Sequence, residues 1–153
     1  MSKIIVIGTA HTDSGVCTSD ALFKIIKEIS PQVIFCEAAP EIFPAMLKAT
    51  EDFNTPEIKT LRTIIKKNLI DIKPIDMYED PFDGRLEAMH ELFRNKIKEY
   101  FYAIEIQANE THRLGFPYLN SEESDQIHKD KYSMEMIFVE KVKNYQLTKT
   151  FQD

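Results

Sequence analysis

Two apolar runs on either side of an amphipathic stretch constrain the fold of this chain most strongly. Residues 3–8 (Lys-Ile-Ile-Val-Ile-Gly) and residues 33–36 (Val-Ile-Phe-Cys) are continuous and rich in β-branched side chains. Between them lies an apolar stripe at helical spacing, made of Leu22, Ile25, Ile26 and Ile29. Short continuous runs of this kind are typical of strands buried on both faces of a parallel sheet. The pattern therefore predicts a strand–helix–strand crossover in an α/β protein.

The rest of the chain predicts one more strand and several helices. We expect an irregular or short helical stretch at about 40–50, a helix from Pro56 to about residue 68, and a third strand over residues 70–75. The longest periodic segment predicts one amphipathic helix over about residues 86–114, ended by glycine and proline. The predicted architecture is thus a small, mainly parallel sheet flanked by helices.

The C-terminal part of the chain predicts the end of the domain. Asn120-Ser-Glu-Glu123 resembles a capping box for a short helix, and the apolar residues between 134 and 142 predict a closing helix. We expect one domain over residues 1–145 and a flexible tail over 146–153. Three strands make a small sheet for so many helices, which predicts either a further strand or an edge or face that a second copy covers in a homodimer.

Composition limits the classes of partner. The net charge is −6, with acidic and basic residues interspersed, which argues against binding to nucleic acid or to anionic membranes. A local basic run (Lys59, Arg62, Lys66 and Lys67) is interpreted as the solvated face of a helix. The sequence predicts neither a signal peptide nor a membrane span. Two cysteines form no disulfide framework, and together these features predict a cytoplasmic protein.

Reactive side chains follow the predicted strands. His11 and Asp13 come after the first strand, Glu37 after the second and Asp76 after the third. In parallel α/β sheets ligands bind beyond the carboxyl ends of the strands, so these residues are expected to converge. One imidazole with several carboxylates can bind a divalent metal or orient a water for general-base attack. The alternative is that Glu37 caps a helix and His11 is an ordinary loop histidine.

The same residues carry a resemblance to a known family. Ile5-Val-Ile-Gly-Thr-Ala-His11 followed by Pro31-Gln-Val-Ile-Phe-Cys-Glu37 resembles the opening of the TraB/Tiki superfamily, which is related more remotely to the haem-uptake and erythromycin-esterase proteins. The resemblance implies an α/β fold with a metal-dependent hydrolytic or ligand site, in which Gly8 and His11 match the Gly-x-x-His motif and Glu37 matches the glutamate. It implies manganese, iron, cobalt or zinc as the metal.

The chain also departs from that family. Members carry a second Gly-x-x-His in their C-terminal half, whereas the remaining glycines here (Gly15, Gly84 and Gly115) have no histidine at that spacing. We expect a shortened paralogue, a fragment, or a half-site completed by dimerisation. Two functional hypotheses follow. The first is a metal-assisted hydrolase site on His11, Glu37, Asp13 and Asp76; the second is a non-enzymatic module that binds a small molecule or peptide as a homodimer.

The other histidines and the cysteines carry weaker signals. His90 and His128 are interpreted as surface residues, and His112 as a partner of the helix macrodipole near a C-terminus. Cys36 lies in a predicted apolar strand and is interpreted as a core residue. A nucleophilic pair of Cys17 and His11 stays open as an alternative.

Overall fold

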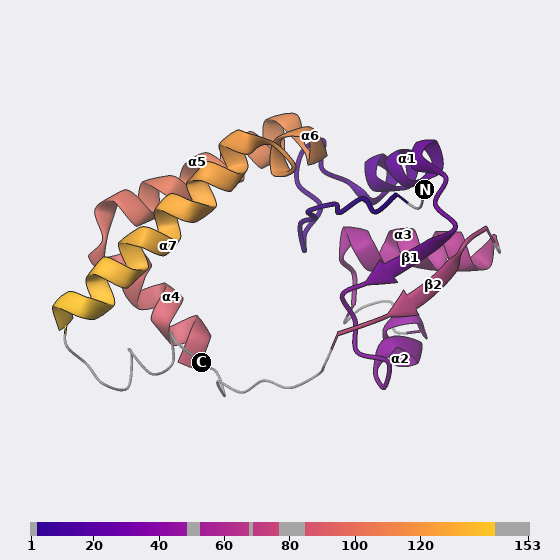
Figure 1. Cartoon of the computed structure of the whole chain (residues 1–153), viewed down its shortest axis with the longest axis horizontal. Helices are drawn as coiled ribbons and strands as arrows, with labels where there is room; N and C mark the ends of the chain where they lie inside the picture. The colour runs from indigo at the N-terminus through magenta and orange to yellow at the C-terminus, as the bar shows by residue number, and fades with distance from the viewer. Residues whose placement is uncertain (1–2, 49–52, 68, 77–84, 143–153) are drawn as a thin grey trace. The chain divides into compact units, whose positions relative to one another are not determined.

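The computed structural model describes residues 3–48, 53–67, 69–76 and 85–142, which form two strands and seven helices (Figure 1). The chain divides into two compact units. The first, here termed the sheet unit, is Met1–Tyr78 with Thr111–Asn120; the second, the helical unit, is Glu79–Glu110 with Ser121–Asp153. The predicted mixed α/β class is confirmed, with a predominance of helix. A single domain over residues 1–145 stays a prediction, and the tail at 146–153 lies outside the described residues.

The sheet unit contains the predicted crossover from one parallel strand to the next. Its elements are α1 (Ser19–Ile29), β1 (Val33–Cys36), α2 (Phe43–Lys48), α3 (Pro56–Lys66) and β2 (Asp71–Pro74). The strands β1 and β2 pair in parallel, and the register runs from Val33 opposite Asp71 to Cys36 opposite Pro74. The structure confirms the strands predicted at 33–36 and 70–75 and the helix predicted from Pro56. The stretch predicted after residue 40 contains a short helix.

Helix caps explain where α1 and α3 begin. Thr18 Oγ1 accepts a hydrogen bond from the N–H of Ala21 at 3.2 Å, and Thr55 Oγ1 accepts one from the N–H of Ile58 at 3.3 Å. Each cap satisfies one of the N–H groups that the first helical turn leaves without a partner. The first helix ends at Ser30, whose φ of 50° places it in the left-handed region.

Two apolar clusters join the helices of this unit to the sheet. One cluster of buried residues comprises Cys17, Leu22, Ile26, Ile64 and Phe116. The other comprises Ala38, Phe43, Ile58 and Leu61. The register partners Ile34 and Ile72 pack against both clusters, so the centre of the sheet links the two.

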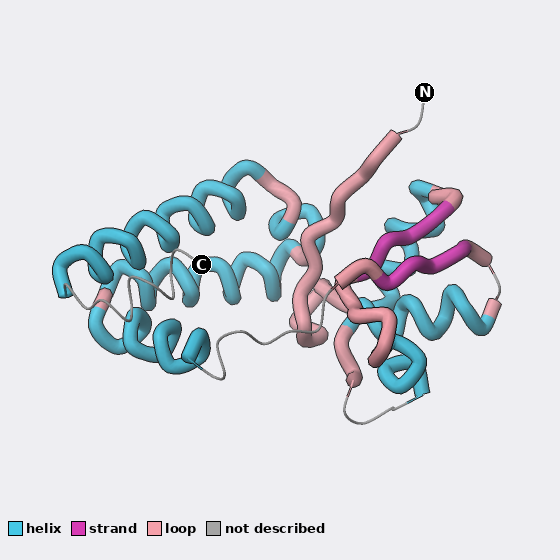
Figure 2. The backbone as a smooth tube through the Cα atoms, turned by 60° about the horizontal axis from the view of Figure 1, so that its bottom comes forward, coloured by secondary structure: helices cyan, strands magenta, loops and turns pink. Residues whose placement is uncertain are grey.

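The predicted first strand over residues 3–8 is wrong. This segment is loop in the structure (Figure 2), and Ile4 and Val6 are 89% and 86% exposed. A side chain takes the place of a neighbouring strand. Gly8 N–H donates to Asn120 Oδ1 at 2.6 Å, and Gly8 C=O accepts from Asn120 Nδ2 at 3.1 Å. The apolar contacts come from Ile7 and Ala10, which pack against the cluster of Cys17 and Leu22.

The long helix predicted over residues 86–114 is two helices. These are α4 (Arg85–Lys96) and α5 (Lys98–Leu114), separated at Ile97. The backbone hydrogen bonds continue across the break, from Ile97 N–H to Phe93 C=O and from Phe101 N–H to Ile97 C=O. The apolar spacing is also continuous, and for this reason the sequence pattern did not reveal the break.

A single long helix replaces the short and closing helices predicted near the C-terminus. After the one-turn helix α6 (Phe116–Leu119), the helix α7 runs over Glu122–Val142. Ser121 begins it: its Oγ accepts from Ser124 N–H at 3.2 Å, and its C=O accepts from Asp125 N–H at 3.1 Å. Within the described residues, no helix has the length and apolar character needed to span a membrane.

The helical unit has its own aromatic core. Met89, Phe93, Tyr100 and Val139 are buried together, one or more from each of α4, α5 and α7. The Phe93 ring lies edge-to-face against Tyr100, with centroids 5.8 Å apart, and against Phe138, with centroids 5.7 Å apart. Such edge-to-face pairs match the positive edge of one ring to the negative face of another.

Candidate functional site

An exposed histidine faces a glutamate at the start of α3. His11 Nδ1 lies 3.6 Å from Glu57 Oε1, and the imidazole is 86% exposed. Thr9 Oγ1 donates to the same glutamate oxygen at 2.6 Å. The distance between His11 Nδ1 and Glu57 Oε1 is longer than that of a hydrogen bond. Thr9, His11 and Glu57 thus form a compact polar group that we term the His11 site.

The start of α3 fixes the position of Glu57. Thr55 caps the helix and Pro56 occupies its first turn, so Glu57 follows directly in that turn. A carboxylate at this place interacts favourably with the helix macrodipole. Glu57 Oε2 is buried and has no hydrogen-bond partner among the described residues. The sequence pattern does not single out Glu57, because acidic residues are common in the first turn of a helix.

Asp13 supports the structure around this site. Its Oδ1 accepts from Ser19 N–H at 3.1 Å, which satisfies an N–H at the start of α1, and its Oδ2 forms an ion pair with Lys59. The hydrogen bond from Lys59, opposed in part by burial and reinforced by Ser19, lowers the pKa of the Asp13 carboxyl below its usual value. Both carboxylate oxygens of Asp13 therefore already have partners.

Glu37 and Asp76 each follow a strand at the carboxyl end of the sheet, where the continued register places Glu37 opposite Ile75 and Asp76 opposite Ala38. Asp76 N–H donates to Ala38 C=O at 3.1 Å, and Ile75 N–H donates to Cys36 C=O at 3.1 Å. These bonds continue the pairing of β1 and β2 by two residues, so Glu37 and Asp76 share one edge as the sequence predicts. Both residues are exposed.

The four predicted metal ligands do not fit a metal site in this arrangement. Among the described residues, no three His, Cys, Asp or Glu side chains are grouped so that they could hold a metal ion. His11 is beside Glu57 rather than Glu37, and Asp13 is held by Lys59. Protein sites for zinc and related ions use three or four such donors. We therefore derive no chemistry that passes through a metal.

Both cysteines have raised pKa values, which disfavours the thiolate. Cys17 is fully buried, and burial raises the pKa of its thiol, with a further rise from the charges of Glu57 and Asp13. Burial also raises the pKa of Cys36. The thiolate is the nucleophilic form of cysteine, so the environment of Cys17 opposes the alternative of a cysteine–histidine pair.

His112 has a structural contact. Its Nδ1 lies 3.2 Å from Ser14 Oγ, and its C=O accepts from Val16 N–H at 3.1 Å. These bonds hold the loop that carries His11 and Asp13 against the end of α5. Gly15 lies in this loop with a φ of 53°, a conformation that favours glycine.

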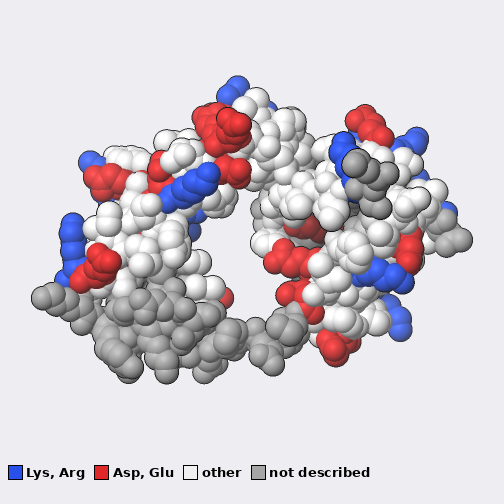
Figure 3. Space-filling model, viewed as in Figure 1, with Lys and Arg blue, Asp and Glu red and all other residues white. Residues whose placement is uncertain are grey.

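The predicted basic run on α3 makes contacts within the sheet unit. Lys59 pairs with Asp13, Arg62 donates to the C=O groups of Met46 and Leu47, and Lys67 lies 4.8 Å from the centre of the Phe23 ring. Figure 3 shows acidic and basic side chains mixed over the face in view. The exclusion of nucleic acid as a partner stays a prediction.

Comparisons with protein-family models, with curated proteins and with solved structures found no match to this chain.

Proposed function

We propose that the sheet unit carries a hydrolase-type acid–base site, with His11 as the base and Glu57 as the residue that orients it. The observation that carries this proposal is the placement of an exposed imidazole with its Nδ1 3.6 Å from a carboxylate oxygen that Thr9 also binds. Nucleophile activation in hydrolases uses this arrangement of a base held by an acidic group.

The chemistry follows from the two nitrogens of the ring. Since Nδ1 faces Glu57, the proton of the neutral imidazole belongs on Nδ1, and Nε2 is left as the acceptor. In the proposed step, Nε2 takes a proton from a water whose oxygen attacks an acyl carbon. The Glu57 carboxylate stabilises the imidazolium that forms, and Nε2 then returns the proton to the leaving group. Catalytic hydrogen bonds are often long in free enzymes and shorten when substrate binds, so we expect the distance of 3.6 Å between His11 Nδ1 and Glu57 Oε1 to shorten in the complex.

The resemblance to the TraB/Tiki superfamily supports a hydrolytic site at this place. It rests on Gly8, His11 and Glu37, and it puts the matching histidine in the role of base or ligand. Glu37 and Asp76 are proposed to contact substrate from the exposed end of the sheet. The divalent metal that the resemblance implies is not part of the proposal, because the described donors do not form a set of three.

Hydrolysis of an activated ester, 4-nitrophenyl acetate, tests the proposal. We expect saturable turnover that falls by about 100-fold in His11→Ala, in line with the usual contribution of a general base. Glu57→Gln should reduce kcat more than it changes KM, because it removes the stabilisation of the imidazolium. Glu99→Gln is the matched control for Glu57→Gln: it removes an exposed carboxylate from the first turn of α5 in the helical unit and should leave the rate unchanged. Turnover that is not saturable, or that Glu99→Gln reduces as much as Glu57→Gln does, would contradict the proposal.

A second candidate is a non-enzymatic module that binds a ligand as a homodimer. The observation that favours it is the exposure of large apolar side chains in the sheet unit, where Ile4, Val6, Phe35 and Ile75 are each more than 60% exposed. A second copy would remove these side chains from water. Light scattering on the purified chain tests it: a dimer that Val6→Lys converts to a monomer supports this candidate. A monomer at every concentration contradicts it.

A further inference from the structure

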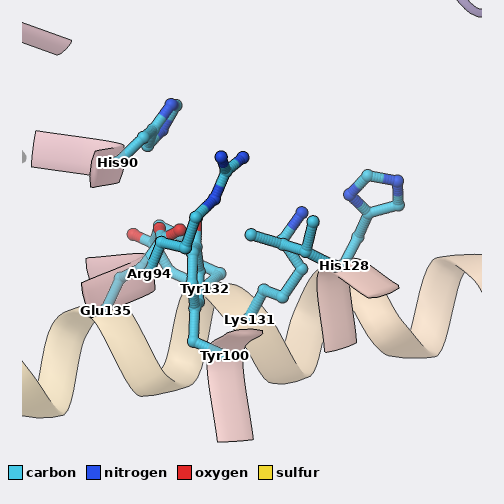
Figure 4. Close-up of a pocket in the computed structure, with 8 residues that line it drawn as sticks. His90, Arg94, Tyr100, His128, Lys131, Tyr132 and Glu135 are labelled. Atoms are coloured by element: carbon cyan, nitrogen blue, oxygen red, sulfur yellow. The ribbon is translucent and has the colours of Figure 1, made fainter. Parts of the chain in front are cut away.

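The helical unit contains a solvent-exposed cavity of about 530 Å³ that the proposed function does not use, and His90, Arg94, His128 and Tyr132 in its lining are exposed. Side chains from α4, α5 and α7 line it. Four of them end in nitrogen: His90 and Arg94 from α4, and His128 and Lys131 from α7. Figure 4 shows Arg94, Lys131 and His128 extending to the same side of α7, with His90 beside them. The volume lies within the range of about 300–1,000 Å³ that is typical of small-molecule sites.

The two cations of this cavity have one carboxylate near them, Glu135, whose charge acts on Lys131 without a close ion pair. Among the described residues, no Asp or Glu oxygen lies within 4 Å of the charged nitrogens of Arg94 or Lys131. Lys131 Nζ donates instead to Gln107 Oε1 at 3.2 Å and lies 5.6 Å from the centre of the Tyr100 ring. Burial lowers the pKa of Lys131; the charge of Glu135 opposes this shift and the charge of Arg94 reinforces it.

The acidic residue in the lining has another partner. Glu135 is 9% exposed and accepts a hydrogen bond from the hydroxyl of Tyr100. Two cations against this one carboxylate leave one net positive charge in the lining, together with two imidazoles. On a chain whose net charge is −6, a cavity of this sign is a local exception.

We propose that this cavity binds the phosphate group of a small phosphomonoester between Arg94 and Lys131. A guanidinium and an ammonium on facing helices match a doubly charged tetrahedral anion, since arginine can donate two parallel hydrogen bonds and lysine supplies a point charge. His90 would add a donor to the phosphate oxygens, and so would Nδ1 of His128, whose Nε2 accepts from Gln107 Nε2 at 2.6 Å. Tyr132, which also lines the cavity and is 56% exposed, offers an aromatic surface for the organic part of the ligand.

This proposal is independent of the one for the sheet unit, because none of its residues belongs to the His11 site. Either proposal can fail while the other holds. The hydrolysis assay on His11→Ala reads out the sheet unit, whereas binding at Arg94 and Lys131 reads out the helical unit.

Titration of the full chain with phenyl phosphate, followed by backbone amide NMR, tests the proposal. Inorganic phosphate serves as a second probe and benzoate as a singly charged control. We expect saturable shifts in α4 and α7 around Arg94 and Lys131, with a Kd of about 1 mM or tighter for phenyl phosphate and weaker binding of benzoate. Arg94→Gln and Lys131→Gln should each weaken binding by about tenfold, as expected for the loss of one charge-assisted contact.

Lys129→Gln is the matched control, because it removes the same charge from an exposed position of α7 outside the cavity. It should leave the Kd unchanged. Equal weakening in all three variants would mean that the ligand responds only to overall charge, and this would overturn the proposal. Absence of saturable shifts in the wild-type chain would also overturn it, whether or not the variants fold. Binding of benzoate as tight as that of phenyl phosphate would refute the choice of a phosphate.

Discussion

Phe93→Ala should remove a large part of the stability of the helical unit. The Phe93 side chain is fully buried and makes edge-to-face contacts with Tyr100 and Phe138. Truncation of a buried phenylalanine to alanine costs about 3–5 kcal/mol, through lost burial and the cavity that remains. The two ring contacts, worth about 0.5–1.5 kcal/mol each, place the expected loss in the upper half of that range. Domains are typically stable by only about 5–15 kcal/mol, so the unit should unfold at much lower urea concentrations.

The assay is urea unfolding followed by helical circular dichroism, with Phe101→Ala as the control. Phe101 is the same residue type on the neighbouring helix but is 40% exposed, so its removal should cost less than about 1 kcal/mol. A double variant with Phe138→Ala should cost less than the sum of the single variants by about 0.5–1.5 kcal/mol, because both remove the same contact. Equal losses in Phe93→Ala and Phe101→Ala would refute the assignment of Phe93 to the core.

Three further predictions concern the sheet unit. Asp13→Asn should cost about 0.5 kcal/mol of stability at neutral pH, because it removes a partly exposed ion pair with Lys59. The ion pair stabilises the fold only while the Asp13 carboxylate is charged. In thermal melts, the difference from wild type should therefore vanish as the pH falls through the lowered pKa of Asp13. Gly15→Ala should cost about 2 kcal/mol or more of stability in thermal unfolding, because the new Cβ would overlap the backbone of His112. Gly8→Ala is the control: its new Cβ would meet the side chain of Asn120 and the backbone of Leu119 only at ordinary contact distance, so its loss of stability should be much smaller. The thiol of Cys17 should react with a disulfide reagent far more slowly in the folded chain than in urea, and rapid labelling without denaturant would contradict its burial and raised pKa.

Local patterns in the sequence were sufficient to predict the centre of the sheet unit. The apolar run at 33–36, the stripe of α1 and the Thr55-Pro56 start of α3 each carry their signal within a few residues. The run at 3–8 carries the same kind of signal, yet the structure has no strand there. Strand formation depends on a partner, and here the backbone of Gly8 binds a side chain 112 residues further along. Tertiary contacts therefore decide whether residues 3–8 form a strand, and the periodicity of the sequence carries no information about such contacts.

The candidate site shows the same limit. Sequence reasoning placed Glu37 and Asp76 at one sheet edge because both directly follow strands, and the hydrogen bond from Asp76 to Ala38 agrees with this. It did not pair His11 with Glu57, because the two residues come from a loop and from the start of a helix 46 positions apart. Nor did it expect Lys59 to hold Asp13. The conformation of the loop that carries His11 and Asp13 decides both contacts, and the residue types in that loop do not determine its conformation.

The division of the sheet unit into two stretches of chain has a consequence for its synthesis. Phe116 completes the cluster that contains Leu22 and Ile64, and Asn120 holds Gly8, yet α4 and most of α5 must leave the ribosome before either residue does. At about 5–20 residues per second, the nascent chain would expose an unfinished apolar surface for on the order of a few seconds. A chaperone that binds apolar segments should therefore engage nascent chains stopped near residue 80 and release chains extended beyond residue 120.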